Sequence, residues 1–167
     1  MKKVALHIDE YACWGCKTCE VACKQEHHQP DGINYVYVTE DGPKSVNGKL
    51  DFIYRLNICQ HCDTPPCVGA CPEKAIVKRE DGIVVLDAER CTGCQVCVDV
   101  CPFGAITFNR AKGTAQKCNL CSHRVDQGLY PACADNICLA HCIYFGDPAK
   151  IEKKVLENRK GGADREK

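Results

Sequence analysis

The sequence has no long apolar run and no excess of charge of either sign. No segment approaches the roughly 18 consecutive apolar residues of a membrane span, so we expect no direct membrane insertion. The 22 basic side chains balance the 22 acidic ones, and no basic stripe is present. A nucleic-acid partner is therefore not expected, because binding to phosphates needs clustered positive charge.

The residue arrangements that carry chemistry on substrates are missing as well. The sequence has no paired carboxylates, nucleophile triad, phosphate-binding P-loop or dinucleotide-binding G-x-G-x-x-G motif. Residues 1–9 contain no apolar signal core, and there is no twin-arginine pair. We therefore expect a cytoplasmic chain that catalyses no reaction by itself.

Cysteine, by contrast, is abundant, with 17 among 167 residues. In a reducing compartment, cysteines at fixed spacings indicate metal ligands rather than disulfides. The run at 91–101 reads C-x2-C-x2-C-x3-C-P, which is typical of bacterial [4Fe–4S] ferredoxins. The run at 13–23 has the same spacing, and the run at 59–71 has two extra residues before its third cysteine. A fourth, stretched run begins at Cys118.

Other metal sites fit these spacings poorly. Zinc sites use pairs of cysteines about 15–20 residues apart, not successive triplets. Covalent haem needs C-x-x-C-H, whereas Ser122 follows Cys121. Four runs of four thiolates predict four [4Fe–4S] clusters, with one cysteine left over.

Short strands are expected between the runs. Alternating patterns predict strands at 4–8, 33–39, 50–58 and 105–109. The strand at 50–58 presents five apolar residues on one side, namely Leu50, Phe52, Tyr54, Leu56 and Ile58. Asp41-Gly42 and Asn47-Gly48 mark the turn of a hairpin inserted after the first run, and residues 75–79 and 83–87 flank the turn of another, Glu80-Asp81-Gly82.

Helices are expected to be short. The C-x3-C endings suit single helical turns. Near the end of the chain, Asp147 and Pro148 are typical of a helix start, and Gly161-Gly162 is expected to stop that helix. The charged residues beyond are expected to form a disordered tail.

The cysteine runs are nested, because the two middle runs form a complete ferredoxin unit with one run outside it on either side. This nesting resembles the four-cluster electron-transfer subunits of molybdenum and tungsten enzymes, such as dimethyl sulfoxide reductase and formate dehydrogenase. Residues 117–124, 128–133 and 145–147 resemble that family's last motif, and the resemblance covers residues 4–148. Residues 11–26 are similar to the small subunits of tungsten enzymes of the aldehyde oxidoreductase type, a group that includes class II benzoyl-CoA reductase.

The resemblance implies an α+β fold of two nested bacterial-ferredoxin-like units with short strands, short helices and an inserted β-hairpin. Residues 1–30 and 111–148 would form the outer, split unit, and residues 57–110 the inner one. The hairpin would occupy 31–56. The last helix and tail would occupy 149–167.

The resemblance also implies that the runs exchange their fourth ligands. The four expected ligand sets are Cys13, Cys16, Cys19 and Cys138; Cys23, Cys118, Cys121 and Cys133; Cys59, Cys62, Cys67 and Cys101; and Cys71, Cys91, Cys94 and Cys97.

The last ligand of the fourth run is either Cys138 or Cys142. Cys142 repeats the C-x3-C ending with Cys138, which would leave Cys133 spare. In the alternative register, Cys142 aligns with Ala75 and Ala105 and acts as a small buried hydrophobe. We favour the second alternative, with Cys138 as the ligand and Cys142 spare.

The function implied is relay of single electrons to or from a large catalytic subunit, which carries a molybdenum or tungsten pterin, and to a further redox partner. The chain would then be one subunit of an anaerobic oxidoreductase complex. Two alternatives are a free-standing polyferredoxin carrier and an iron–sulfur redox sensor. A carrier is isolated alone, whereas a sensor has an additional output module, and none is visible in the sequence.

Some residues beside the runs have more than one interpretation. His61 and His123 adjoin ligands and are expected to be solvated or to support the ligands, while His27 and His28 are expected in a solvated loop. The four hairpin aromatics form either a partner surface or hairpin packing; they are Tyr35, Tyr37, Phe52 and Tyr54.

Overall fold

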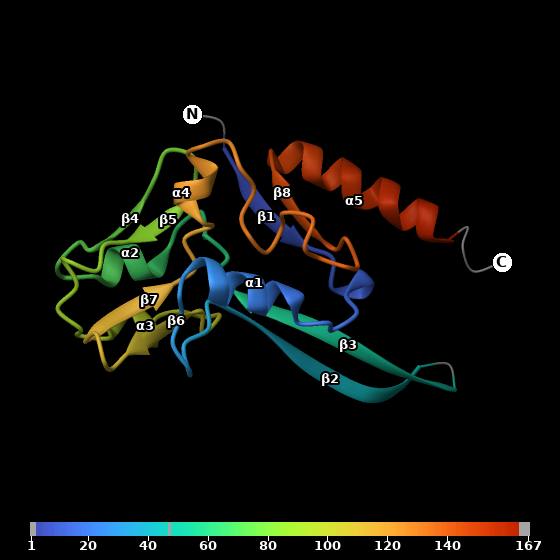
Figure 1. Cartoon of the computed structure of the whole chain (residues 1–167), viewed down its shortest axis with the longest axis horizontal. Helices are drawn as coiled ribbons and strands as arrows, with labels where there is room; N and C mark the ends of the chain where they lie inside the picture. Colours follow the sequence, from blue (N-terminus) through green and yellow to red (C-terminus); the bar gives the residue numbers. More distant parts are fainter. Residues whose placement is uncertain (1–2, 47, 164–167) are drawn as a thin grey trace.

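The computed structural model describes residues 3–46 and 48–163 and shows an α+β fold of short elements (Figure 1). The strands are β1 (Ala5–Ile8), β2 (Val36–Val46), β3 (Lys49–Ile58), β4 (Ile76–Lys78), β5 (Val84–Leu86), β6 (Ile106–Asn109), β7 (Thr114–Lys117) and β8 (Ile143–Gly146). The helices are α1 (Thr18–Glu26), α2 (Pro66–Ala70), α3 (Val96–Asp99), α4 (Ser122–Val125) and α5 (Pro148–Ala163), with a 3₁₀ turn at Glu10–Ala12. The predicted fold class is confirmed.

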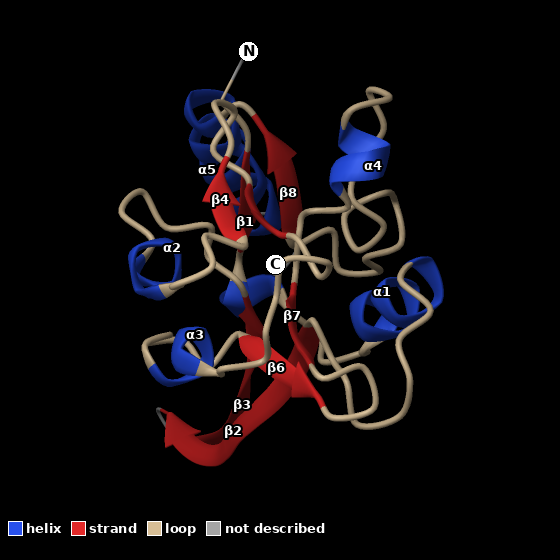
Figure 2. Cartoon of the chain, turned by 90° about the vertical axis from the view of Figure 1, so that its left-hand side faces the viewer, coloured by secondary structure: helices blue, strands red, loops and turns tan. Residues whose placement is uncertain are grey.

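The strands form antiparallel pairs, three of them local hairpins and one joining distant parts of the chain. β2 pairs with β3, β4 with β5, and β6 with β7. β1 instead pairs with β8, so that Ala5 lies opposite Gly146 and Ile8 opposite Ile143. In Figure 2, α2 and α3 lie on one side of these strands and α1 and α4 on the other.

Buried residues gather in two cores. The first contains cysteines of the first and fourth runs together with apolar residues of β2, β3 and β8. The second contains Cys67 and Cys97 of the middle runs with Ile76, Val84 and Ile106. Buried cysteines of the first and fourth runs therefore lie in one core and those of the middle runs in the other, although Cys59 of the second run packs against the first core.

The predicted hairpins form, but the inserted one differs in detail. β2 starts at Val36 and continues through Asp41-Gly42, where the register shifts instead of turning. Asn47, part of the other predicted turn signal, lies outside the described residues. Of the five apolar residues predicted to share a face of β3, only Leu56 and Ile58 are buried, because the far end of the hairpin extends beyond the rest of the chain (Figure 1).

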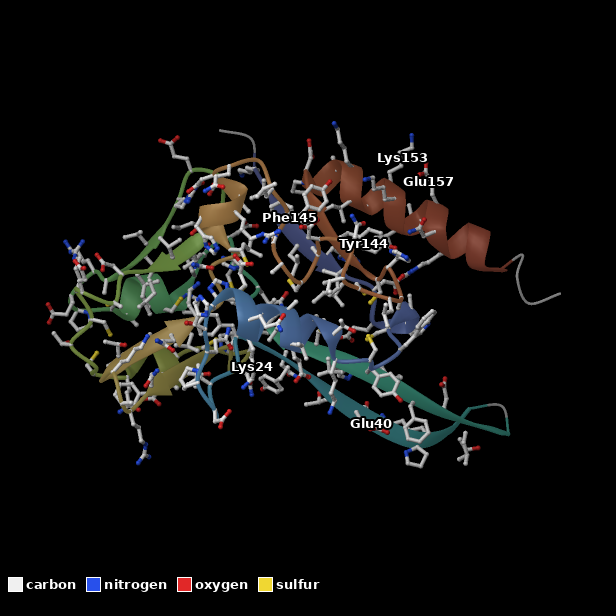
Figure 3. All side chains as sticks on the ribbon, viewed as in Figure 1. Lys24, Glu40, Tyr144, Phe145, Lys153 and Glu157 are labelled. Carbon is white, nitrogen blue, oxygen red and sulfur yellow. The ribbon has the colours of Figure 1, made fainter. Side chains whose placement is uncertain are left out.

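The last helix starts where expected and ends later than expected. The Asp147 carboxylate accepts a hydrogen bond from the Ala149 N–H at 3.0 Å, which caps the helix. Gly161-Gly162 does not stop α5, which continues to Ala163, and the tail beyond it lies outside the described residues. Lys153 and Glu157 project from the outer side of α5 (Figure 3).

Candidate metal centres

Two cavities in the middle of the chain are each lined by four cysteines. One is bounded by Cys71, Cys91, Cys94 and Cys97. The other is bounded by Cys59, Cys62, Cys67 and Cys101. These are the two sets that the resemblance implied for the inner unit.

Two short helices carry cysteines from one cavity to the other. Cys67 lies in α2 and lines one cavity, while Cys71 follows the helix and lines the other. Cys97 lies in α3, and Cys101 follows it into the cavity of Cys67. A single helical turn advances the chain by about 5.4 Å, so each C-x3-C ending joins two neighbouring cavities at a fixed distance.

The outer cysteines approach one another in two further groups. Burial raises the pKa of Cys133, and the nearby sulfurs of Cys118, Cys121, Cys23 and Cys19 raise it further. Cys118, Cys121 and Cys23 belong with Cys133 to the second expected set, whereas Cys19 belongs to the first.

The other outer group contains cysteines from both ends of the chain. Burial raises the pKa of Cys19 to about 12, with smaller contributions from Cys13 and Cys138. The Leu139 backbone contacts Cys16, which brings this exposed cysteine to the same place. α1 connects the two outer groups, because Cys19 and Cys23 both lie on it.

Cys138 adopts the same local geometry as two cysteines of the middle runs. The Ala75 N–H donates to Cys71 Sγ at 3.3 Å, and the Ala105 N–H donates to Cys101 Sγ at 3.4 Å. Likewise, the Cys142 N–H donates to Cys138 Sγ at 3.4 Å. Cys142 therefore occupies the position of the two alanines.

Several of the buried thiols do not ionise readily by themselves. Burial raises the pKa of Cys23 and Cys97 to about 11 and that of Cys118 to about 12. Iron removes this obstacle, because a thiol that coordinates a metal is deprotonated. Among the described residues, no three potential ligands lie close enough to share a single metal ion; the middle cysteines instead line two cavities, four to each.

His61 offers an unpaired donor to one of these cavities. Its Nδ1 accepts a hydrogen bond from the Val84 N–H at 2.9 Å, so the proton of the neutral ring is on Nε2. Nε2 is buried without a partner among the described residues, and His61 lines the cavity of Cys59, Cys62 and Cys67. A cluster sulfur there would accept this hydrogen bond. His61 is thus half-buried, with Nε2 shielded from solvent, and suits the supporting role.

Lys117 is a buried cation that also fits bound clusters. Its side chain is only 4% exposed, and Nζ donates to the carbonyl oxygens of Val84 and Cys118. Its charge lowers the pKa of both Cys67 and Cys118, although burial outweighs it at each. A buried ammonium group needs a compensating negative charge, and clusters with four thiolate ligands are anions.

Sequence reasoning misassigned His27 and did not single out Gln29. His27, expected in a solvated loop, is mostly buried, and its Nε2 lies 3.3 Å from Cys121 Sγ. Gln29 donates to Cys23 Sγ at 3.3 Å. His123 is half-exposed and contacts Glu26 at 2.7 Å. The sequence indicated only which histidines adjoin a cysteine. It could not indicate that His27 contacts Cys121, which is 94 residues away in the sequence.

Comparison with known proteins identifies this arrangement. The family model described as "4Fe-4S dicluster domain" matches residues 50–148, and the model described as "4Fe-4S binding domain" matches residues 10–32. The chain belongs to the 4Fe-4S dicluster domain family. It is therefore an iron–sulfur protein that binds [4Fe–4S] clusters, as predicted.

The curated relatives of this 4Fe-4S dicluster protein are subunits of reductases. The B subunit of tetrathionate reductase from Salmonella typhimurium is 42% identical over 87% of this chain, which spans 58% of that relative's length. The electron transfer subunit of thiosulfate reductase from Salmonella typhi is 39% identical over 91% of this chain and 80% of its own. The B subunit of anaerobic dimethyl sulfoxide reductase from Escherichia coli is 39% identical over 88% of this chain and 75% of its own length. The predicted family is confirmed.

None of the helices in residues 3–46 and 48–163 is both long and apolar enough to cross a bilayer.

Proposed function

We propose that this chain is the electron-transfer subunit of an oxidoreductase complex and relays single electrons through four [4Fe–4S] clusters. The observation that carries the proposal is the placement of cysteines around adjoining centres that single helices connect. The proposed ligand sets are Cys13, Cys16, Cys19 and Cys138; Cys23, Cys118, Cys121 and Cys133; Cys59, Cys62, Cys67 and Cys101; and Cys71, Cys91, Cys94 and Cys97.

The contacts between these sets support a linear order. α1 holds Cys19 of the first set and Cys23 of the second. Cys118 of the second set lies near Cys59 of the third, since the Cys59 sulfur raises the pKa of Cys118. α2 and α3 join the third and fourth sets. Bound clusters supply one-electron redox chemistry, and the chain's own part is to fix their order and spacing and to exclude water.

The two ends of this order are the places where electrons can enter and leave. Cys16 of the first set and Cys94 of the fourth set are exposed, whereas Cys118, Cys121 and Cys133 of the second set are buried. A partner that donates electrons and a partner that accepts them can therefore bind at opposite ends.

The partner at one end is proposed to be a catalytic oxidoreductase subunit that contains a molybdenum or tungsten pterin. The relatives support this, because they are named as subunits of reductases, and one of them as the electron transfer subunit. A cytoplasmic location is proposed on the 17 free cysteines, which a reducing compartment protects. The alternative is a free-standing carrier, which would be isolated without a catalytic subunit.

Anaerobic purification of the chain from its native source tests the proposal. We expect about sixteen iron and sixteen sulfide per chain and stoichiometric co-purification of one large pterin-containing subunit. Iron near twelve would remove one cluster from the proposal. Stoichiometric zinc would overturn it, and full iron content without a partner would favour the carrier.

A further inference from the structure

Cys142 is a buried thiol in contact with a proposed cluster ligand. Its side chain is 1% exposed, and its Sγ lies 3.5 Å from Cys138 Sγ. It also lies close to Cys13, another proposed ligand of the same cluster. Free cysteine is a common small core residue, so its burial alone assigns no role.

The two equivalent positions in the middle runs show that a sulfur is not needed for packing. Ala75 and Ala105 are also buried, and their N–H groups make the same hydrogen bond to the cysteine four residues earlier. The residue before each position has a left-handed backbone, with φ of 50° at Lys74, 56° at Gly104 and 49° at His141. An alanine therefore fits this local structure. What the sulfur of Cys142 adds is the contact with Cys138 Sγ.

The direction of the hydrogen bond between the two sulfurs follows from their chemistry. Cys138 as an iron ligand is a thiolate and has no proton. Cys142 is not a proposed ligand, and a cysteine that binds no metal carries its proton at neutral pH, since its ordinary pKa is about 8.5. The S–H group of Cys142 is then the donor and Cys138 Sγ the acceptor.

We propose that Cys142 donates a hydrogen bond to Cys138 and thereby raises the reduction potential of the cluster held by Cys13, Cys16, Cys19 and Cys138. Hydrogen bonds to the sulfurs are among the determinants of cluster potentials. A reduced cluster has one more negative charge than an oxidised cluster, so a donor stabilises the reduced form more. This role rests on the proposed function, specifically on Cys138 as the ligand.

The test is Cys142→Ala in the full chain, with iron analysis and a redox titration followed by electron paramagnetic resonance. We expect full iron content and a reduced-to-oxidised ratio for one cluster that is lower by up to about tenfold at a fixed potential. For a one-electron couple, tenfold corresponds to about 59 mV. Cys142→Ser retains a donor and should keep the potential at or above its original value.

The reciprocal variant Ala75→Cys tests the same contact at a second cluster. It places a thiol beside Cys71, in the wall of the cavity that Cys91, Cys94 and Cys97 also line. We expect the potential of that cluster to rise while the others stay unchanged. Ala75→Cys therefore tests the hydrogen-bond role even if Cys142→Ala binds its clusters poorly.

The outcomes separate this role from the ligand assignment. Full iron content with unchanged potentials in both Cys142→Ala and Ala75→Cys would overturn the hydrogen-bond role and leave the proposed function intact. Loss of one cluster in Cys142→Ala, with all clusters kept in Cys138→Ala, would make Cys142 the ligand. The ligand assignment and the role of Cys142 would then both be wrong, but the chain would still relay electrons.

Discussion

The buried ammonium group of Lys117 lies between two proposed centres, near Cys67 of one and Cys118 of the other. In Lys117→Met, two buried carbonyl oxygens lose a donor, which costs about 1–3 kcal/mol of stability for a buried unpaired group. The variant also removes a positive charge that favours the reduced clusters. We expect lower potentials for these two clusters in a redox titration.

Lys78 provides a matched control. Its ammonium group donates to the Cys62 and Asp63 carbonyl oxygens, but it also pairs with the Asp63 carboxylate at 3.3 Å and is 25% exposed. Solvent screens the charge of Lys78 more strongly, so Lys78→Met should shift the potentials less. Equal shifts in the two variants would contradict the importance of burial at Lys117.

Gly15 allows the first cysteine run to lie against the inserted hairpin. Its φ is +66°, and a Cβ there would lie 2.4 Å from the Tyr54 ring. We expect Gly15→Ala to reduce the iron content by about four per chain, because the loop that holds Cys13, Cys16 and Cys19 must move. Iron analysis of the anaerobically purified variant measures this loss.

The Gly32→Ala substitution is a control that distinguishes the clash with Tyr54 from backbone strain. Its φ is +77°, but a Cβ there would have nothing within 4 Å. Gly32→Ala should therefore cost only the left-handed strain of about 1–2 kcal/mol and keep all the iron. Tyr54→Ala should restore iron to Gly15→Ala, and failure of this rescue would show that the ring contact is not the cause.

At the scale of elements, α5 packs on the fold through the buried Ile151 and Val155 and is also tied to it by one buried carboxylate. Asp9 is 2% exposed. Its carboxylate accepts one hydrogen bond from Arg159 Nε at 2.9 Å and another from Arg159 Nη2 at 3.0 Å. These bonds lower the pKa of Asp9, despite its burial. We expect Arg159→Met to increase hydrogen exchange in α5, whereas Lys153→Met on the exposed side should not, since its pair with Glu157 is solvated.

The same contact gives α5 a pH dependence of known sign. Because the folded-state pKa of Asp9 lies below the ordinary value of about 3.9, its contribution is fully present above that pH. It is lost as the pH falls through the lowered pKa. The protection factor of α5, which corrects for the intrinsic pH dependence of amide exchange, should thus fall only in acid, and a fall between pH 5 and 7 would contradict this anchor.

Local elements could be predicted from the sequence, and their distant partners could not. The hairpin around Gly82 and the C-x3-C turns depend on residues close in sequence, so spacing and alternation were sufficient. β7 was not predicted, because Thr114–Lys117 has no apolar alternation and becomes a strand by pairing with β6. Lys117 is polar and therefore gave no signal that it would be buried.

At the scale of the whole molecule, the cysteines replace much of an ordinary hydrophobic core. In the first core, six of the twelve buried residues are cysteines. Removing the clusters would leave these thiols without the iron that holds them together, so metal binding is part of the folding free energy. We expect the chain without clusters to lose its cooperative thermal unfolding and its near-ultraviolet circular dichroism.

An oxidant with a chelator would remove the clusters, and the holoprotein with chelator alone under anaerobic conditions is the control. Protection of β1 and β8 from hydrogen exchange should disappear with the iron. If the protein without clusters kept cooperative unfolding and this protection, its apolar residues would be sufficient for the fold.

The pairing of β1 with β8 also determines the order in which the molecule can be built. The ribosome makes β1 first, but its partner starts at Ile143, 26 residues after β7 ends at Lys117. At about 5–20 residues per second, the middle hairpins are complete roughly one to five seconds earlier. The middle cysteines can therefore receive iron while the chain is still being made. In the proposed ligand sets, the thiols at 13–19 must wait for Cys138, and during that interval they are exposed to oxidation or to binding a wrong metal.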